Sequence, residues 1–139
     1  MEIQETGRKI SHLNQLFLHN YINLENEIHV SVIDYNVFLT IQENPGCSQL
    51  FLANKRNVQR SLLTRIVKKY VEMGLIERRG SKYNKSAYAL FLTETGEKVT
   101  QKIRHKIFEI NEKIYNSCSS DQYQQLNEIL DIIITHWNS

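Results

Sequence analysis

Residues 62–80 read LLTRIVKKYVEMGLIERRG, and this stretch decides the fold of the chain. Val58, Leu62, Ile66 and Tyr70 recur every four residues, with Leu63, Val67 and Val71 beside them, which predicts the buried face of a helix over 57–73. Gly74 suits the left-handed position that ends a helix. The residues that follow, LIERR, are typical of a short strand. A basic helix that runs straight into a basic strand is the pattern that has to be explained.

Two further helices are predicted immediately upstream of this stretch. Asp34 suits the N-cap of a helix that buries Val37, Phe38 and Ile41 and ends near residue 43. Ser48 suits the N-cap of a second, shorter helix, and the Pro-Gly pair in ENPGCSQ marks the turn between the two. Before them, apolar residues at steps of three and four predict a long first helix.

The segment after the basic strand completes a known motif. SAYALFL, residues 86–92, alternates apolar side chains and predicts a second strand, with GSKYNK as the polar loop of a hairpin. Two short helices followed by a hairpin predict a winged helix-turn-helix. The fold class is therefore mainly α with a small β-hairpin wing, flanked by N- and C-terminal helices.

Two helices are predicted after the hairpin. Thr93 suits the N-cap of the first, and Ser119 or Ser120 suits the N-cap of the second. The last helix has apolar residues over far more than one stripe, namely Leu126, Ile129, Leu130, Ile132, Ile133, Ile134 and Trp137. A helix of this kind has to be buried on several sides. On a chain of 139 residues, this predicts a subunit interface.

Positive charge is concentrated in the central segment. Between Lys55 and Lys85 the chain has ten basic and two acidic residues, a net charge of +8. The remainder has seven basic and thirteen acidic residues, a net charge of −6, so the overall +2 conceals the contrast. A basic centre between acidic flanks indicates a binding site for a polyanion, because a solvated surface normally mixes both signs.

The second helix of a helix-turn-helix enters the major groove of DNA, where its N-terminal side chains reach base edges. If Val58, Leu62 and Ile66 face the core, polar side chains that can pair with bases point outward. Lysines further along the helix suit the phosphate backbone, and lysines of the hairpin loop suit the backbone or the minor groove. The predicted DNA-binding residues are Asn57, Gln59, Arg60, Ser61, Thr64, Arg65, Lys68, Lys69, Lys82 and Lys85.

LTRIVKKYVEMGLIERR, residues 63–79, and YALFLTETGEK, residues 88–98, carry a resemblance to a known family. They resemble the MarR family of bacterial transcription factors, which has a recognition helix with Thr-Arg, a Gly-Leu-Val/Ile-x-Arg strand, a wing and Leu-Thr-x-x-Gly. The resemblance covers residues 34–98. In the wing, where the family usually has Asp-Arg-Arg or Asp-x-Arg, this chain has Asn84, Lys85 and Ser86. We expect this wing to contribute charge more than sequence reading.

The resemblance implies a transcriptional regulator that binds double-stranded DNA at a pseudo-palindromic operator as a homodimer. Within one domain of residues 1–139, residues 31–93 would form the DNA-binding lobe, and residues 1–30 and 94–139 the dimerisation helices. Members of the family commonly act as repressors that a small-molecule effector releases. The sequence itself does not distinguish a repressor from an activator.

Three alternatives stay open. A winged helix can serve as a protein-interaction adaptor whose basic surface meets an acidic partner. Five histidines invite a metal-sensing role, but no Cys-x-x-Cys motif or close histidine-carboxylate cluster accompanies them, so we expect no metal site. Cys47 and Cys118 would sense oxidants if one of them were an exposed thiol of lowered pKa.

The remaining features concern ligands, catalysis and location. Phe17, Tyr21, Tyr35 and Phe38 could line a ligand pocket between the dimerisation helices and the DNA-binding lobe, although their helical spacing also suits a core. No glycine-rich phosphate loop or nucleophile motif is present, so we expect neither an enzyme nor a cofactor. No segment approaches the roughly 18 apolar residues of a membrane helix, which favours a cytoplasmic protein.

Overall fold

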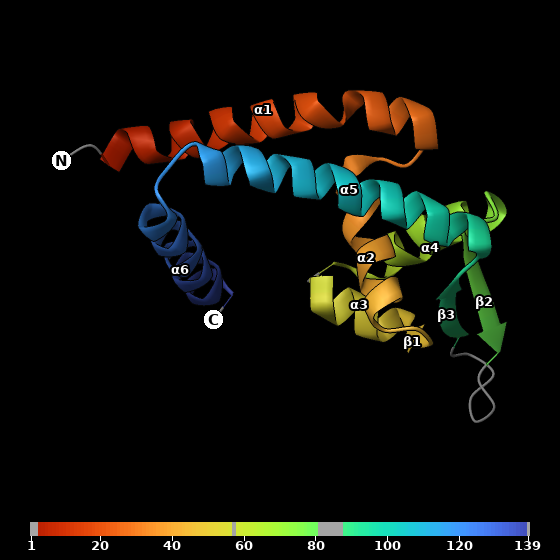
Figure 1. Ribbon diagram of the computed structural model, residues 1–139. Helices are drawn as coiled ribbons and strands as arrows, with labels where there is room; N and C mark the ends of the chain where they lie inside the picture. The colour runs from red at the N-terminus through yellow and green to blue at the C-terminus, as the bar shows by residue number, and fades with distance from the viewer. Residues whose placement is uncertain (1–2, 57, 81–87, 139) are drawn as a thin grey trace. The chain divides into compact units, whose positions relative to one another are not determined.

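The computed structural model describes residues 3–56, 58–80 and 88–138 (Figure 1). The chain divides into two compact units, Met1–Arg104 and His105–Ser139. The elements of the first unit are α1 (Ile3–Ile28), the 3-10 helix η1 (Val32–Asp34), α2 (Tyr35–Glu43), β1 (Cys47–Ser48), α3 (Gln49–Arg56), α4 (Arg60–Glu72), β2 (Ile76–Gly80), β3 (Tyr88–Leu92) and the beginning of α5 (Glu94–Asn116). The second unit contains the rest of α5 and α6 (Ser120–Trp137).

The three strands form one antiparallel sheet in the order β1-β3-β2. Strands β2 and β3 are the predicted hairpin, with Ile76 opposite Leu92 and Gly80 opposite Tyr88. Strand β1 was not predicted, because two residues are too short for any alternation to be recognised. It is held at the sheet edge by the turn before it, where Gly46 has a φ of 85° and its N–H donates to the Leu90 carbonyl at 2.8 Å.

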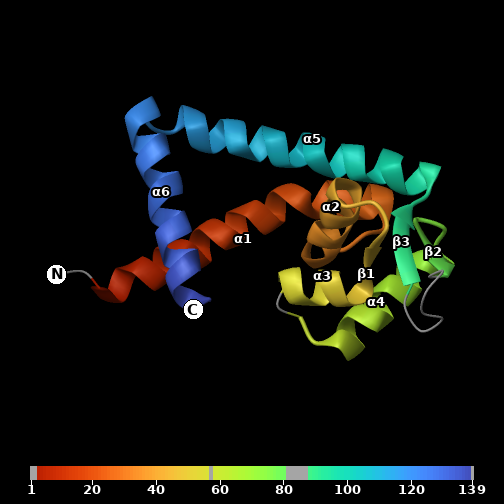
Figure 2. The same ribbon diagram turned by 90° about the horizontal axis from the view of Figure 1, so that it is seen from below.

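The helices α2, α3 and α4 lie together beside this sheet (Figures 1 and 2). Their buried residues form the core with Leu75, which precedes β2, with the first residue of β2 and with the centre of β3. The core residues are Val37, Phe38, Ile41, Leu52, Ala53, Leu63, Val67, Tyr70, Leu75, Ile76 and Leu90. Ser48 accepts a bond from the Phe51 N–H at 3.0 Å and thus caps α3 as predicted. The winged helix-turn-helix prediction is confirmed, and the sheet gains a third strand.

The Leu-Thr-x-x-Gly motif joins the sheet to α5. The Thr93 hydroxyl oxygen accepts from the Gly96 N–H at 3.0 Å, as an N-cap does, and the hydroxyl also donates to the Gly74 carbonyl at 2.6 Å. The Thr93 N–H donates to the Leu75 carbonyl at 3.1 Å. Gly96 is buried directly against that same carbonyl, where a Cβ atom would overlap the oxygen. The motif therefore fixes the start of α5 on the residues that link α4 to β2.

The second unit leaves apolar surface uncovered. Helix α6 begins at Ser119, which forms a reciprocal capping box with Gln122, as predicted for Ser119. None of the residues of α6, all of which the structure describes, is buried, and Trp137 is 82% exposed. In the first unit, α1 likewise exposes Ile10, Leu13 and Leu16. None of the described helices is long and apolar enough to cross a membrane.

Replacing Gly96 by alanine should destabilise the fold by about 3 kcal/mol, because the added methyl group overlaps the Leu75 carbonyl oxygen and the backbone has to move. The free energy of unfolding in urea measures this loss. Gly7→Ala is the matched control, since a Cβ at Gly7 in α1 meets nothing within 4 Å. That variant should be neutral or gain up to about 1 kcal/mol in helix propensity. Equal stability of the two variants would contradict the packing described for Gly96.

Candidate nucleic-acid interface

Helix α4 begins later than the sequence predicts. It starts at Arg60, with Gln59 at the N-cap position in an extended conformation (φ −63°, ψ 140°). The Val58 N–H donates to the Ala53 carbonyl at 3.0 Å, so the chain at Val58 still closes the end of α3 instead of starting α4. The predicted start at Asn57 is therefore wrong by three residues. Asn57 itself lies outside the described residues.

The buried face of α4 is also narrower than the predicted one, which spanned two apolar stripes. Leu63, Val67 and Tyr70 are fully buried, whereas Leu62 is 42% exposed and Ile66 is partly exposed. The sequence contains two neighbouring apolar stripes, and periodicity alone does not tell which of them packs against the protein. The assignment of Leu62 to the core was wrong. Leu62 becomes an exposed apolar side chain among the polar ones.

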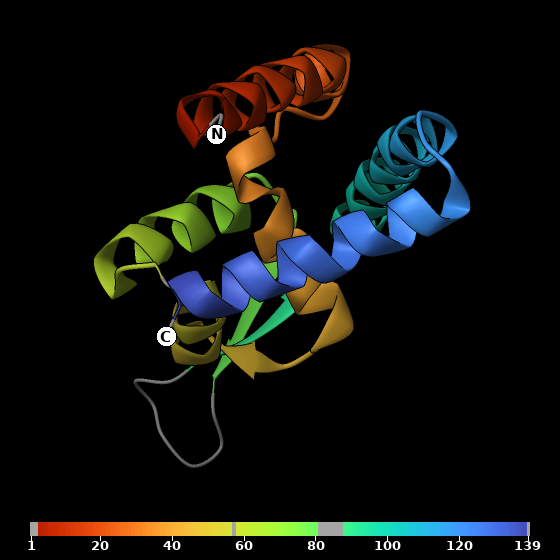
Figure 3. The same ribbon diagram turned by 90° about the vertical axis from the view of Figure 1, so that its left-hand side faces the viewer.

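The outer face of α4 has the predicted composition of a nucleic-acid-binding surface. Figure 3 shows this helix, in yellow-green, from its side. The predicted contact residues that the structure describes are all exposed, namely Gln59, Arg60, Ser61, Thr64, Arg65, Lys68 and Lys69. We call these seven residues and Leu62 the α4 surface. Lys82 and Lys85, the predicted wing contacts, lie outside the described residues.

One neighbour of the α4 surface comes from α3. The Gln49 side-chain NH₂ donates to the Thr64 hydroxyl oxygen at 3.2 Å, and the Thr64 hydroxyl donates to the Arg60 carbonyl at 2.8 Å. Sequence reasoning did not select Gln49. Its position as the first residue of α3, directly after the predicted N-cap Ser48, is the signal that could have identified it.

The two arginines at the end of the opening stretch have a different role. The Arg79 guanidinium lies 3.9 Å from the centre of the Phe91 ring, and its Nε lies 3.2 Å from a Glu77 carboxylate oxygen. The Arg78 guanidinium lies 5.4 Å from the centre of the Tyr88 ring. Both arginines therefore lie over aromatic rings of the neighbouring strand, where cation–π contacts stabilise the hairpin. The basic segment thus contains a helix with exposed basic side chains and a strand whose two arginines pack against aromatic rings.

The inner side of α4 is attached to the segment that follows α1. The buried Tyr70 hydroxyl donates to the Asp34 carboxylate at 2.5 Å and accepts from the Ser31 N–H at 3.4 Å. Burial, and then the hydrogen bond to Asp34, raises the pKa of Tyr70. Asp34 was predicted as the N-cap of α2, and it does occupy that position, but its side chain makes no capping bond there. Its carboxylate accepts from Tyr70 instead.

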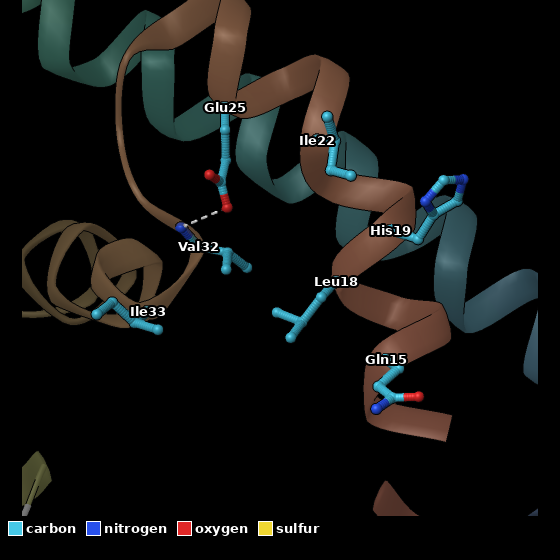
Figure 4. Close-up of a pocket in the computed structure, with 7 residues that line it drawn as sticks. All are labelled: Gln15, Leu18, His19, Ile22, Glu25, Val32 and Ile33. Carbon is cyan, nitrogen blue, oxygen red and sulfur yellow. Dashed lines mark hydrogen bonds between the residues drawn. The ribbon is translucent and has the colours of Figure 1, made fainter. Parts of the chain in front are cut away.

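A groove of about 500 Å³ lies between α1 and η1 (Figure 4). In Figure 4, the Glu25 carboxylate accepts from the Val32 N–H, at 3.1 Å, beside the apolar side chains of Leu18 and Ile33. Its lining residues are Gln15, Leu18, His19, Ile22, Glu25, Val32 and Ile33.

The four aromatic residues predicted to line a ligand pocket are not among those that line this groove. Phe38 is fully buried against the Tyr70 ring, with the ring centres 5.0 Å apart. Tyr35 is buried and meets the ring of Tyr21 edge to face at 5.4 Å. Phe17 is partly exposed on α1. A ligand pocket at these four residues stays a prediction.

The histidines and cysteines were considered for metal and redox chemistry. Among the described residues, no group of three or more His, Cys, Asp or Glu side chains could hold a metal ion. Cys47 is half-buried in β1, and burial raises the pKa of its thiol. This shift is opposite to the lowered pKa that activates an oxidant-sensing cysteine.

Helix α3, the exposed second helix α4 and the β2–β3 hairpin define a winged helix-turn-helix protein. The sequence model of the MarR family matches residues 33–85 of this chain. The chain is 33% identical over 90 residues to the HTH-type transcriptional regulator BilQ of Clostridium symbiosum, covering 65% of this chain and 62% of BilQ. It is 30% identical over 96 residues to the uncharacterized HTH-type transcriptional regulator YybA of Bacillus subtilis, covering 69% of this chain and 64% of YybA. Over its winged helix-turn-helix the chain is therefore similar to proteins of the MarR family.

The same fold occurs in solved structures. The crystal structure of FabT from Streptococcus pneumoniae in complex with DNA superposes with a TM-score of 0.84 at 17% identity, covering 97% of this chain and 96% of FabT. At that identity the likeness concerns the fold. The matches to BilQ and YybA span less than two thirds of the length of each relative.

Replacing Tyr70 by phenylalanine should cost about 2 kcal/mol in the free energy of unfolding, because the buried Asp34 carboxylate loses its hydroxyl donor. Tyr35→Phe is the matched control, since the Tyr35 hydroxyl is buried and has no hydrogen-bond partner among the described residues. That change should be neutral or slightly stabilising. Urea denaturation of both variants at pH 7 measures the difference. A loss of similar size in both would mean that the Tyr70–Asp34 bond contributes nothing of its own.

Proposed function

We propose that this chain is a sequence-specific, double-stranded DNA-binding regulator of transcription that acts in the cytoplasm as a homodimer. One observation carries the proposal. In a winged helix-turn-helix fold, the helix that would enter the major groove buries one apolar stripe and exposes polar and basic side chains over the rest of its surface. This distribution of charge favours the binding of a polyanion.

The comparisons support the same function. BilQ and YybA are both described as transcriptional regulators of the helix-turn-helix type, and FabT was solved with DNA bound. The family's recognition helix corresponds in this chain to α4, within the segment that matches the family description.

Six residues of the α4 surface have a proposed role. Arg60 and Arg65 would pair with guanine or with phosphate, and Gln59 and Ser61 would reach base edges at the start of the helix. Lys68 and Lys69 would bind the phosphate backbone. Asn57 and the wing lysines, Lys82 and Lys85, remain part of the proposed interface.

A dimer would cover the apolar surface that a single chain leaves exposed. Helix α6 exposes Ile129, Ile132, Ile134 and Trp137, and α1 separately exposes a row of leucine and isoleucine side chains. Monomeric proteins rarely keep such a patch in water, so the exposed faces favour burial against a second copy. Two copies would also present two α4 helices to the two halves of a palindrome.

A protein-interaction adaptor is the competing function, and it would need no palindrome and no dimer. We retain release by a small molecule as a prediction from the family.

Selection from random DNA duplexes at about 0.15 M salt tests the proposed function, because that salt suppresses non-specific phosphate binding. We expect enrichment of a palindrome whose half-sites lie about one helical turn apart. If no duplex is enriched while the protein is folded and dimeric, sequence-specific DNA binding is excluded under these conditions and the adaptor becomes the better explanation.

Within the α4 surface, arginine and lysine should affect DNA binding differently. Arg65→Ala should lose about 1–3 kcal/mol on the selected operator and relax the preference at one base position. Lys68→Ala should weaken binding to every sequence and reduce the slope of log K against log salt by about one. Lys98→Ala, an exposed lysine on α5 outside the α4 surface, is the control and should change neither quantity. Fluorescence anisotropy at several salt concentrations measures DNA binding by all three variants. An unaltered slope for Lys68→Ala would contradict the proposed contact between Lys68 and a phosphate.

Substitutions in α6 test the proposed dimer. Ile129→Asp combined with Ile133→Asp should give a monomer at about 10 μM, since two carboxylates would have to be buried in the interface. Gln125→Asp adds a carboxylate at an exposed polar position of the same helix and should leave the dimer intact. Light scattering coupled to size exclusion gives the mass of each variant. A wild-type monomer at this concentration would overturn the proposed dimer.

A further inference from the structure

A contact between the two helices of the helix-turn-helix points to a specificity determinant outside α4. Gln49, the first residue of α3, donates through its Nε2 atom to the Thr64 hydroxyl oxygen at 3.2 Å. Thr64 lies in the first half of α4 and is exposed. This is the part of a recognition helix from which side chains reach base edges.

Hydrogen-bond accounting fixes the orientation of both groups. A threonine hydroxyl has one proton, and the Thr64 proton is used by the Arg60 carbonyl at 2.8 Å. The Gln49 amide must therefore offer its NH₂ group, not its oxygen, to Thr64. With its proton committed and one lone pair occupied, the Thr64 hydroxyl has little capacity left for a base. The methyl group is the part of this exposed side chain that has no such commitment.

We propose that Gln49 is a positioning residue that holds Thr64 so that this position reads the C5 methyl group of thymine by apolar contact. The inference rests on the proposed DNA binding and specifies one element of its sequence preference. A threonine methyl against the thymine methyl is a recognised mode of direct readout in the major groove.

Reading a thymine methyl group requires a fixed Thr64 rotamer, and the contact with Gln49 helps to fix it. Threonine in a helix divides between two χ1 rotamers, one of which bonds back to the carbonyl four residues earlier. Thr64 adopts the back-bonded arrangement, and the bond from Gln49 favours the same one. Fixing the rotamer before DNA binds lowers the ordering cost of binding. It also presents one constant shape to the base.

Replacing single thymines of the selected operator by deoxyuridine tests the proposal, since this removes the C5 methyl group and keeps the pairing edge unchanged. Each half-site should contain one thymine whose replacement alone weakens binding of the wild-type protein about fourfold, as expected for the burial of one methyl group. If uracil has no effect at any thymine of an operator that the protein binds specifically, this inference is overturned while the proposed function stands. If selection yields no operator, both the proposed DNA-binding function and this inference are overturned.

Variants at position 64 separate the methyl group from the hydroxyl. Thr64→Ser keeps the hydroxyl and removes the methyl, so it should bind the thymine and uracil operators equally. Thr64→Val keeps a methyl and has one strongly preferred rotamer in a helix, so it should keep the discrimination. Full discrimination by Thr64→Ser would assign the reading to another side chain and overturn the proposal.

Gln49→Ala tests the positioning role. It should reduce the fourfold discrimination towards onefold in the wild-type background and have no effect on discrimination in the Thr64→Val background, where no hydroxyl has to be held. Thermal unfolding of each variant confirms that the protein is folded at the assay temperature. If Gln49→Ala retains the fourfold discrimination in the wild-type background, Gln49 has no positioning role.

Discussion

The bond from the Tyr70 hydroxyl to the Asp34 carboxylate is the constraint on which the placement of α4 depends. It lies in the core beside Phe38, and with Leu63 and Val67 it determines which side of α4 faces the protein. A buried carboxylate without a donor is costly, so the rotation of α4 about its axis is restricted to orientations that keep Tyr70 close to Asp34. The outer face is left to the polar and basic side chains as a consequence.

The central positive charge therefore serves two purposes. On α4 the charges are exposed and available to a polyanion, because the apolar stripe already supplies the packing of this helix. On β2 the guanidinium groups of Arg78 and Arg79 lie over aromatic rings of β3. The close passage from helix to strand, with Gly74 at a φ of 76°, brings these two groups of charges into one short segment.

Much of the fold could be predicted because its signals are local. The caps at Ser48, Thr93 and Ser119, the glycine at the end of α4 and the alternation in β3 each act within a few residues. The errors concern choices that only tertiary contacts decide. Which of two adjacent apolar stripes packs depends on the partners of Tyr70, and β1 exists only because β3 offers it an edge. The proposed role of Gln49 depends on a contact with a residue fifteen positions away in sequence, which no local pattern contains.

The segment between α1 and α2 links the proposed dimer to the proposed DNA interface. The Glu25 carboxylate on α1 accepts from the Val32 N–H, and the neighbouring Ser31 N–H donates to the hydroxyl of Tyr70 on α4. Through these bonds the position of α4 follows that of the end of α1 within one protomer. If α1 helps to form the dimer, the distance between two α4 helices is then set by the same few bonds. Because that distance has to match the separation of two half-sites, the choice of operator would depend on this buried segment as well as on the side chains that touch the bases.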